Sequence, residues 1–179
     1  MKPSVLITGS SRGLGRAIAE GLAQDPYSLV LHCRSRRDEA DALAAAIADG
    51  GGDARVLQFD VADREAAKAA IEADMEAHGA YYGVICNAGI TRDASFPAFE
   101  DKDWDEVINT NLTSFYNVLH PIIMPMIQRR ARSRIITVAS MSGITGNRGQ
   151  VNYSASKGGI IAATKALAVE LAKRKITVN

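Results

Sequence analysis

The chain has 179 residues, of which 47% are hydrophobic and 23% charged, so it is long enough to bury the core of one soluble domain. Its net charge of +1 gives no argument for a nucleic-acid partner or an anionic membrane surface, and we expect neither. The sequence shows no signal-peptide pattern and no apolar run long enough to cross a bilayer. We therefore expect a cytoplasmic protein.

Few side chains suggest redox or metal chemistry. Cys33 and Cys86 both lie in apolar runs, and we expect them to be free, buried thiols in a reducing compartment. The three histidines are His32, His78 and His120, and they are isolated along the sequence. No metal site is expected.

Short apolar runs rich in β-formers alternate with longer, alanine-rich segments of helical periodicity. Strands are predicted at Ser4–Thr8, Ser28–Cys33, Ala54–Phe59, Gly83–Cys86, Arg134–Ala139 and, in its first residues, Ile176–Asn179. Helices are predicted at Leu14–Gln24, Asp38–Ala48, Arg64–Glu76, Trp104–Arg130 and Asn152–Lys173. For the fourth helix, Asp101 is the candidate cap, and Pro121 and Pro125 are expected to bend or interrupt the second half.

The predicted strands are apolar without alternation, which favours burial on both faces, as in parallel sheets. Alternation of strands and helices, with right-handed crossovers, then predicts a doubly wound α/β sheet in a single domain over residues 1–179. In such sheets ligands bind at the carboxyl ends of the strands, near the point where the strand order reverses.

A glycine-rich loop follows the first predicted strand and opens directly into a helix. It runs from Thr8 to Gly15, with glycines spaced G-x3-G-x-G rather than the G-x-G-x-x-G of many dinucleotide enzymes. Glycines let the backbone turn sharply and approach a pyrophosphate, which then sits at the positive end of the helix. A glycine triplet also occurs in ordinary loops, but the strand–loop–helix context favours phosphate binding.

A tyrosine and a lysine stand four residues apart in the last predicted helix. Tyr153 and Lys157 therefore lie one turn apart on the same face. At about 4 Å and an effective dielectric of about 20, opposite charges attract by roughly 4 kcal/mol, which favours phenolate over phenol. A tyrosine in that position can give or take a proton near neutral pH. Such pairs are often only surface neighbours, so the assignment needs support from the rest of the chain.

That support comes from a joint pattern. It comprises the loop Thr8–Gly15, the run Cys86-Asn87-Ala88-Gly89, Asn111, Ser140, Tyr153 and Lys157. Together these resemble the short-chain dehydrogenase/reductase family, and within it most closely the 3-oxoacyl-[acyl-carrier-protein] reductases. The resemblance covers the whole chain in the expected order, with Cys86 where the family usually has a first asparagine. It implies a Rossmann fold and an oxidoreductase of fatty acid or polyketide-like biosynthesis.

The resemblance implies a catalytic set of Asn111, Ser140, Tyr153 and Lys157. Ser140 would hydrogen-bond the substrate carbonyl oxygen, and Tyr153 would deliver the proton. Lys157 would favour the ionised form of the tyrosine and bind the nicotinamide ribose, while Asn111 would hold a kinked helix backbone that positions a relay water. The chemistry is coherent, because hydride transfer leaves an alkoxide that needs a donor already in place. Taken alone, Asn111 and Ser140 also have ordinary structural explanations.

The implied cofactor is NADPH/NADP+. NAD-preferring folds carry an acid at the end of the second strand, whereas here Arg34-Ser35-Arg36-Arg37 follows it, with no acid before Asp38. A guanidinium favours a 2′-phosphate, so Arg12, Arg34 and Ser35 are the expected contacts, unless these arginines are only solvated loop charges. The full implied cofactor set is Gly9, Ser11, Arg12, Gly13, Leu14, Gly15, Arg34, Ser35, Asp60, Val61, Asn87, Ala88, Gly89, Tyr153 and Lys157.

Two members of that set have competing explanations. Asp60, with Val61, stands where the family holds the adenine ring, but it could instead cap the helix that begins at Arg64. Asn87 precedes two small residues that permit close approach to ribose, and its amide can brace neighbouring strands. A purely structural turn remains the alternative for Asn87.

The implied substrate is bound to an acyl carrier protein, which is acidic and should meet a basic patch near the mouth of the pocket. The candidate contacts are Arg129, Arg130, Arg132 and Arg174. The alternative is that these cations only complement the dipoles of helix ends. Apolar faces on Trp104–Arg130 and Asn152–Lys173 (Phe115, Val118, Leu119, Ile122; Ile160, Ala163, Leu167) cover the sheet and leave surface for a homodimer, or by resemblance a homotetramer.

In the family, the chain continues beyond the position of Asn179 with the rest of the sixth strand, a cofactor turn, a substrate lid and a seventh strand. We therefore expect the sequence to be part of a longer chain, with one sheet edge exposed and the substrate pocket open. Two alternatives stay open: a reductase or dehydrogenase of the same family acting on a free ketone, alcohol, sugar or quinone, and, if the chain truly ends at Asn179, a non-catalytic cofactor-binding or scaffold protein.

Overall fold

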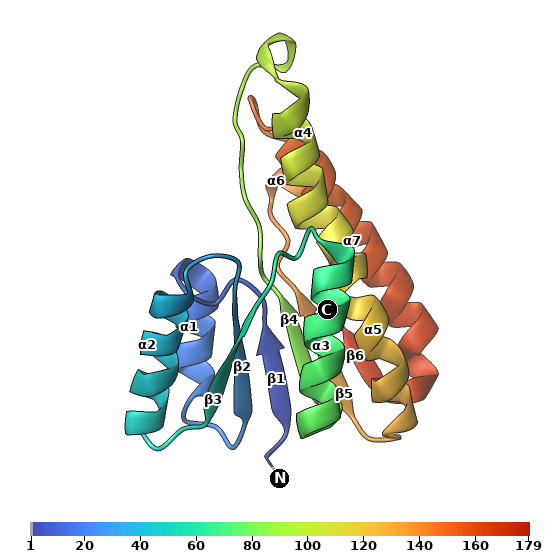
Figure 1. The fold of residues 1–179 in the computed structure, drawn as a ribbon. Helices are drawn as coiled ribbons and strands as arrows, with labels where there is room; N and C mark the ends of the chain where they lie inside the picture. Colours follow the sequence, from blue (N-terminus) through green and yellow to red (C-terminus); the bar gives the residue numbers. More distant parts are fainter. Residues whose placement is uncertain (1) are drawn as a thin grey trace.

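The computed structural model describes residues 2–179 and contains a six-stranded parallel sheet (Figure 1). The strands are β1 (Ser4–Ile7), β2 (Ser28–Cys33), β3 (Ala54–Gln58), β4 (Gly83–Cys86), β5 (Ser133–Thr137) and β6 (Ile176–Val178). Their spatial order is β3-β2-β1-β4-β5-β6, so the order reverses between β1 and β4. The predicted doubly wound sheet is confirmed, and the reversal marks the edge where ligands bind in such sheets.

Seven α-helices connect and cover the described strands. They are α1 (Gly13–Leu22), α2 (Arg37–Asp49), α3 (Arg64–His78), α4 (Asp101–Val107), α5 (Ser114–Gln128), α6 (Ser142–Thr145) and α7 (Val151–Leu171). A π-helical segment at Ile108–Thr113 joins α4 to α5, and short 3₁₀ turns lie at Phe96–Ala98 and Ala172–Arg174. The short α6 and the turn at Phe96–Ala98 were not predicted.

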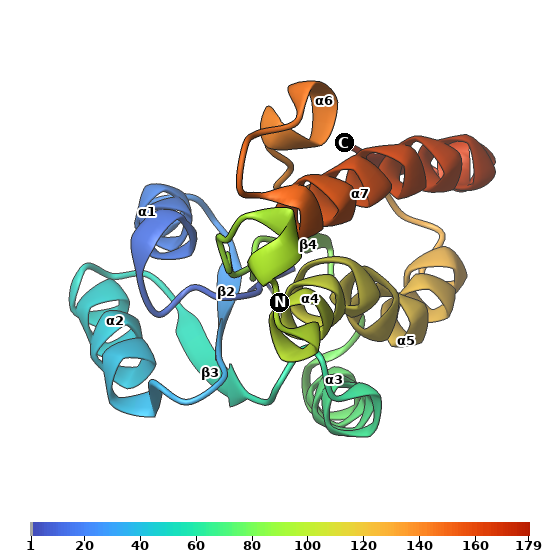
Figure 2. The same ribbon diagram turned by 90° about the horizontal axis from the view of Figure 1, so that it is seen from above.

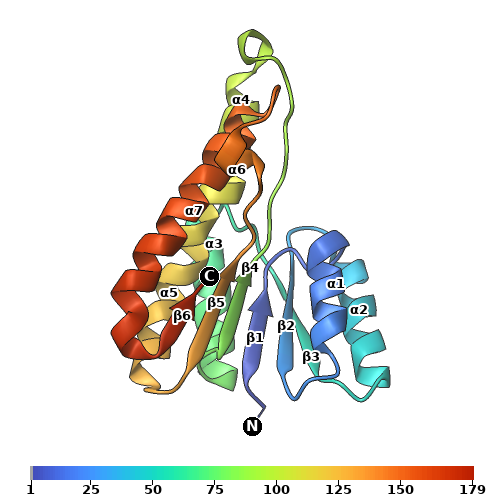
Figure 3. The same cartoon turned by 180° about the vertical axis from the view of Figure 1, so that it is seen from behind.

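The core has two layers, one on each face of the sheet. Side chains of α3, α5 and α7 pack with Leu6, Val84 and Ile135 on one face. Side chains of α1 and α2 pack with Ile7 and Leu31 on the other face. Figure 3 shows these two helices beside β2 and β3 from behind. Every residue of β1 and β2 is buried, which explains why these strands lack alternation.

The start of the long predicted helix differs from the expectation. The helix begins at Asp101, with Glu100 in the cap position and no side-chain cap bond, so Asp101 is its first residue and not its cap. The regular helix then ends at Val107, and an extra residue enters the turn over Ile108–Thr113. Such π-helical turns frequently lie at functional sites.

Of the two effects expected of the prolines, bending or interruption of the helix, interruption does not occur. α5 runs through both Pro121 and Pro125 to Gln128. Each proline removes one backbone hydrogen bond, but Ile122 and Met126 beside them are fully buried in the core. Packing of that face therefore maintains a helix that local propensity disfavours.

Two segments extend together beyond the carboxyl ends of the strands (Figure 1). One is the loop after β4 with α4, and the other is the amino end of α7 with the turn before it. The backbone N–H of Ala94 donates to the carbonyl of Gly149 at 3.0 Å, and Gln150 Nε2 donates to Asp93 Oδ2 at 2.9 Å. These bonds join the two segments above the sheet.

None of the helices in residues 2–179 is both long enough and apolar enough to span a bilayer.

Candidate active site

Two adjoining hollows form one cleft at the carboxyl ends of the strands. The first, about 460 Å³, lies between the loops that follow β1 to β4, and the second, about 470 Å³, lies between the loop after β4, the end of β5 and α7. Both are bordered by Arg12, Leu14, Asn87, Gly89 and Ile90. The first is lined by the expected cofactor residues Gly9, Ser11, Arg12, Gly13, Leu14, Arg34, Ser35, Asp60, Val61, Asn87, Ala88 and Gly89, and the second by Tyr153 and Lys157.

The glycine loop leaves the start of α1 open to this cleft. Gly15 packs beneath the loop, where a Cβ atom would lie 2.3 Å from the carbonyl oxygen of Gly9 and 2.5 Å from Asn87 Nδ2, so any larger residue would push α1 away. The cap position, Arg12, makes no side-chain cap bond, and the first turn carries no acid. The first backbone N–H groups of a helix lack intrahelical partners, and here they are free of competing anions. This end of α1 therefore fits a phosphate group.

The loop is held on its β4 side by Thr8 and Asn87. Thr8 Oγ1 accepts hydrogen bonds of 3.0 Å from the backbone N–H groups of Asn87 and Ala88. In return, Asn87 Nδ2 donates to the carbonyl oxygens of Thr8 at 2.9 Å and Gly9 at 3.1 Å. The asparagine thus braces the neighbouring strand ends, as its sequence position suggested.

On the β2 side the loop is held by His32, which sequence reasoning treated as isolated. Its Nδ1 accepts from the backbone N–H of Gly9 at 3.0 Å, and its Nε2 lies 2.9 Å from the carbonyl oxygen of Phe59. The residue is 2% exposed and also borders the first hollow. Burial lowers the pKa of His32 to about 4. An imidazole within the apolar run that follows Ser28 in the strand SLVLHC was the signal that could have revealed it.

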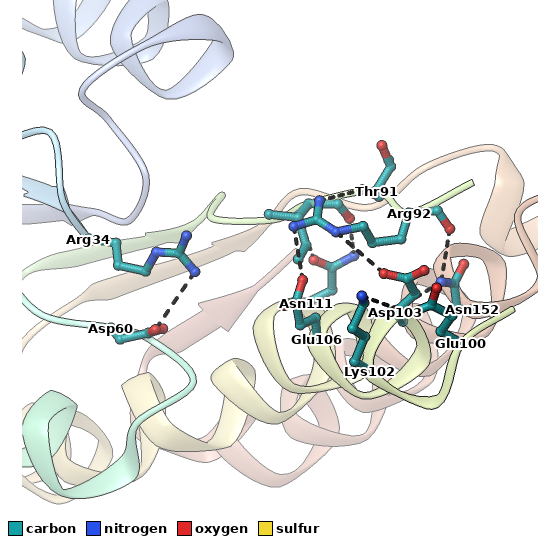
Figure 4. Close-up of polar contacts among 11 residues, drawn as sticks. Arg34, Asp60, Thr91, Arg92, Glu100, Lys102, Asp103, Glu106, Asn111 and Asn152 are labelled. Atoms are coloured by element: carbon teal, nitrogen blue, oxygen red, sulfur yellow. Dashed lines mark hydrogen bonds and ion pairs between the residues drawn. The ribbon is translucent and has the colours of Figure 1, made fainter. Parts of the chain in front are cut away.

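The arginines after β2 are not equivalent. Arg36 pairs with Glu39, and Arg37 pairs with Asp41 at 2.9 Å; both of these acidic residues lie on α2. Arg34 instead points to the loop after β3, where its Nη1 lies 3.8 Å from Asp60 Oδ2 (Figure 4). Both side chains are exposed, so this pair contributes little energy and leaves the guanidinium free to bind an anion.

Asp60 does not cap α3. That position belongs to Asp63, whose side chain accepts from the backbone N–H of Ala66 at 3.0 Å. Asp60 Oδ1 instead accepts from the N–H of Ala62 within its own turn. The capping explanation for Asp60 is therefore wrong, and its carboxylate faces Arg34 across the first hollow.

Tyr153 and Lys157 lie on the same side of α7, as predicted. Lys157 Nζ is 5.7 Å from the centre of the Tyr153 ring and donates to the carbonyl oxygen of Val138 at 2.7 Å. Lys157 is only 4% exposed, and burial lowers the pKa of its ammonium group. Ser140 follows two residues after Val138, and its Oγ accepts from the N–H of Ser142 at 3.2 Å. Val138 and Ala139 line the second hollow, whereas Ser140 stands just beyond its lining.

Asn111 lies in the π-helical segment and ties it to two other parts of the site. Its Oδ1 accepts from the N–H of Ile90 at 2.8 Å, and its Nδ2 donates to the Ile90 carbonyl oxygen at 3.0 Å and to Ser156 Oγ at 3.1 Å. Ser156 Oγ in turn donates to the carbonyl oxygen of Tyr153 at 2.8 Å. The backbone at Asn111 is π-helical rather than regular α-helix, and Ser156, which sequence reasoning missed, connects Asn111 to the turn between Tyr153 and Lys157.

Close backbone packing holds α7 in place at Lys157. A Cβ atom on Gly143 would lie 2.6 Å from the carbonyl carbon of Lys157 and 2.7 Å from the nitrogen of Gly158. Only glycine lets α6 approach α7 this closely. Figure 2 shows α7 between α6 on one side and α4 with α5 on the other. The segment that carries Ser140 is thereby placed against the helix that carries Tyr153.

Asn152, the residue before Tyr153, was also missed by sequence reasoning. It is fully buried, and its Nδ2 donates to the carbonyl oxygens of Arg92 at 3.0 Å and Asp103 at 3.2 Å. The guanidinium of Arg92 pairs with Glu106 at 2.9 Å, so the loop after β4 is tied to both α4 and α7 (Figure 4). A polar residue on the buried side of a helix, directly beside Tyr153, was the available signal.

The arginines suggested for a carrier-protein contact lie elsewhere. Arg129, Arg130 and Arg132 precede β5, and Arg174 precedes β6, so all four are at the amino ends of strands, opposite the cleft. The expectation that they border the mouth of the pocket in this subunit is therefore wrong. Arg129 also has local partners, since its Nη2 donates to the Arg132 carbonyl oxygen at 2.7 Å and to Ser133 Oγ at 3.1 Å.

Cys33 and Cys86 are free, and burial raises the pKa of both thiols, that of Cys86 to about 12. Between residues 2 and 179, no three His, Cys, Asp or Glu side chains gather as potential metal ligands.

Comparison with known proteins places this geometry in a family context. Residues 3–179 match the family model described as short chain dehydrogenase. A 3-oxoacyl-[acyl-carrier-protein] reductase FabG of Aggregatibacter actinomycetemcomitans is 65% identical over 179 residues, which is 100% of this chain and 74% of that protein. Proteins of the same name from Staphylococcus aureus (39%; 100% of this chain and 72% of that protein) and Vibrio harveyi (40%; 97% and 69%) are more distant.

The environment of His32 predicts a pH dependence of stability. Its pKa is about 4 in the folded protein and about 6.5 in an unfolded chain, so only the unfolded chain binds a proton between these values. The unfolding free energy should therefore fall by about 3 kcal/mol as the pH drops from 6.5 to 4, and this contribution should not change further below 4. Urea denaturation of the wild type and of His32→Asn across this range measures it. A difference between the two proteins that does not vary with pH would contradict the assignment.

Proposed function

The chain belongs to the short-chain dehydrogenase family and is an oxidoreductase acting on CH–OH and C=O groups, and we propose that it uses NADPH to reduce a 3-oxoacyl group carried by an acyl carrier protein. The product would be the corresponding 3-hydroxyacyl thioester, in fatty acid or polyketide-like biosynthesis. The observation that carries the proposal is the continuous cleft, which joins the open end of α1 to Tyr153 and Lys157. The names of the relatives support the substrate class.

The first hollow fits the phosphate-bearing half of the dinucleotide. The uncapped start of α1 would bind the pyrophosphate, and the small residues Ala88 and Gly89 leave room for ribose. Arg12 and Arg34 line the same hollow and would bind the 2′-phosphate, with Ser35 beside them. Asp60 and Val61 would border the adenine.

The second hollow supplies the groups for proton transfer. When bound, the nicotinamide would supply the hydride to the carbonyl carbon. Tyr153 would donate the proton to the carbonyl oxygen, and Ser140 would hydrogen-bond the same oxygen as negative charge develops on it. The buried Lys157, fixed by the Val138 carbonyl, would favour the phenolate form of Tyr153 and bind the ribose. Asn111 would hold the kinked segment for a relay water.

Exposed apolar side chains in the segment after Ser140 suit an acyl chain. Met141 and Ile144 follow Ser140 and are 67% and 69% exposed. One observation favours a second candidate, a reductase or dehydrogenase that reduces a free ketone or quinone or oxidises a free alcohol or sugar: the basic residues suggested for the carrier lie at the far end of the sheet. We further propose a homodimer or homotetramer through α5 and α7, which leave Tyr116, Met124 and Val169 exposed. A cytoplasmic location stays a prediction.

Replacing Tyr153 tests the assignment of the proton donor. Tyr153→Phe removes only the hydroxyl, so kcat should fall by a factor of about 100 or more, while NADPH binding stays nearly unchanged. Steady-state kinetics and a calorimetric titration with NADPH measure the two effects. Tyr27→Phe, before β2 at the other end of the sheet, is the matched control. A Tyr153→Phe variant with near-normal kcat would show that another group donates the proton.

Arg34→Asp tests the choice between NADPH and NADH. Loss of a charge-assisted hydrogen bond to the 2′-phosphate should raise KM for NADPH by about tenfold or more and shift the preference toward NADH. Arg37→Asp is the matched control, because Arg37 pairs with Asp41 on α2 and lies outside the cleft lining. If the ratio of kcat/KM for the two dinucleotides does not change in Arg34→Asp, the 2′-phosphate contact is excluded.

The carrier contact is tested with two substrates. Because Arg130 and Arg132 lie at the edge of the sheet opposite the cleft, the double variant Arg130→Glu/Arg132→Glu should leave KM nearly unchanged both for the carrier-bound 3-oxoacyl substrate and for a small free ketone, as expected of cations that only complement helix dipoles. Arg129 is left intact because its side chain holds the loop before β5. A KM raised for the carrier-bound substrate alone would show instead that these cations meet an acidic carrier.

A further inference from the structure

His32 is a buried titratable group that the proposed chemistry does not use. We propose that it is a positioning residue for the dinucleotide: as a neutral imidazole protonated only at Nε2, it ties Gly9 of the phosphate-binding loop to Phe59 and holds that loop in its binding shape. The inference rests on the proposed dinucleotide site. Nothing in the family pattern of glycine loop, Ser140, Tyr153 and Lys157 requires a histidine here.

The two partners of the ring determine which nitrogen carries the proton. The backbone N–H of Gly9 can only donate, so Nδ1 must present its lone pair at 3.0 Å. The carbonyl oxygen of Phe59 can only accept, so Nε2 must carry the hydrogen at 2.9 Å. The imidazolium form and the Nδ1–H tautomer would each set two N–H groups against each other at Gly9. One neutral tautomer alone satisfies both contacts.

The tie acts at the point where the loop leaves β1. Gly9 directly follows Thr8 and has φ +67°, so the backbone changes direction here as it turns toward α1. A hydrogen bond to the N–H of Gly9 therefore fixes the loop at this turn. The next residue, Ser10, is bonded to the backbone of His32 itself. Ser10 Oγ accepts from the N–H of His32 at 2.8 Å, and the N–H of Ser10 donates to the carbonyl oxygen of His32 at 2.9 Å. At the other side, Phe59 immediately precedes Asp60 in the hollow. The imidazole therefore connects the loops after β1 and β3.

The surroundings keep the ring neutral. Burial lowers its pKa to about 4, against smaller effects of the Phe59 hydrogen bond and of Asp60, which raise it. The charged groups that line the hollow with it are Asp60 from the loop after β3, Arg34 and Arg36 from the loop after β2, and Arg12 from the glycine loop. The ring also packs on Phe59, with centroids 4.2 Å apart. The competing explanation is that His32 holds the loop only through the packing of its ring on Phe59. The test must therefore separate the loss of ring packing from the loss of each hydrogen bond.

Two amide variants make that separation. In His32→Asn the amide oxygen falls near the Nδ1 position and keeps an acceptor for Gly9, but the bond to Phe59 is lost. In His32→Gln the amide nitrogen falls near the Nε2 position and keeps the donor to Phe59, but Gly9 loses its acceptor. Both variants remove the ring, so they lose the packing on Phe59 alike. The thermal unfolding of the two variants is also measured, so that a change in binding can be told apart from a loss of overall stability.

The experiment measures Kd for NADPH and NADH by calorimetry, amide hydrogen exchange at Gly9, and ¹⁵N shifts of the wild-type imidazole. We expect His32→Gln to raise Kd for both dinucleotides about tenfold and to speed Gly9 exchange, and His32→Asn, which keeps the acceptor for Gly9, to change both quantities clearly less. The wild-type ring should show the Nε2–H tautomer from pH 8 to pH 5.5.

Equal Kd values in the two variants, or an Nδ1–H tautomer in the wild type, would overturn the proposal. Even if a variant fails to fold, the ¹⁵N measurement on the wild type shows which nitrogen of His32 is protonated, and an Nδ1–H tautomer would still overturn the proposal. If the wild type binds neither dinucleotide although the tautomer and the Gly9 protection are as stated, the proposed function fails, and with it the positioning role. If it binds NADH as tightly as NADPH, the choice of cofactor is wrong, but the comparison of His32 variants stands.

Discussion

The parallel direction of all six strands is the constraint on which the rest of this structure depends. Parallel strands end at the same edge, so loops far apart in the sequence meet there. The glycine loop follows β1, Arg34 follows β2, Asp60 follows β3, Asn87 follows β4 and Ser140 follows β5. The reversal of strand order between β1 and β4 opens the space between these loops, and Thr8, Asn87 and His32 hold the glycine loop beside it through side-chain bonds. One edge therefore provides an uncapped helix end and cations in a single cleft.

The side chains that we propose for proton transfer are placed by a different principle. Tyr153 and Lys157 belong to a helix, so their position relative to the strand ends depends on how that helix packs. Gly143 permits backbone contact between α6 and α7, and the link from Asn111 through Ser156 fixes the turn between Tyr153 and Lys157. The π-helical turn aims Asn111 at both Ile90 and Ser156, which a regular helix would not offer in the same register. Helix packing thus brings the tyrosine to the cleft that the strand ends create.

Much of the fold and of the candidate site was predictable, because the sequence patterns that determine them are local. Unbroken apolar runs predicted all six strands within a few residues, and the spacing of Tyr153 and Lys157 predicted their shared face. Long-range contacts decided the rest: Met126 and Ile122 keep α5 intact through two prolines, Asp63 rather than Asp60 caps α3, and His32 has its partners in the loops after two other strands. The position of Arg129 and Arg130 was misjudged despite an available argument, since residues before a parallel strand lie at the edge opposite the ligand.

The central claim is that one cleft holds a nicotinamide dinucleotide with its reactive carbon beside Tyr153. Transfer of deuterium tests it most directly. NADPH deuterated at C4 of the nicotinamide, in each of the two stereochemical forms, is incubated with the protein and a 3-oxoacyl carrier substrate, and the product is analysed by mass spectrometry. Because the cleft fixes one face of the ring, we predict that one form alone delivers its deuterium to C3 of the 3-hydroxyacyl product. Product without deuterium from either form, equal transfer from both, or unreacted substrate would contradict the account.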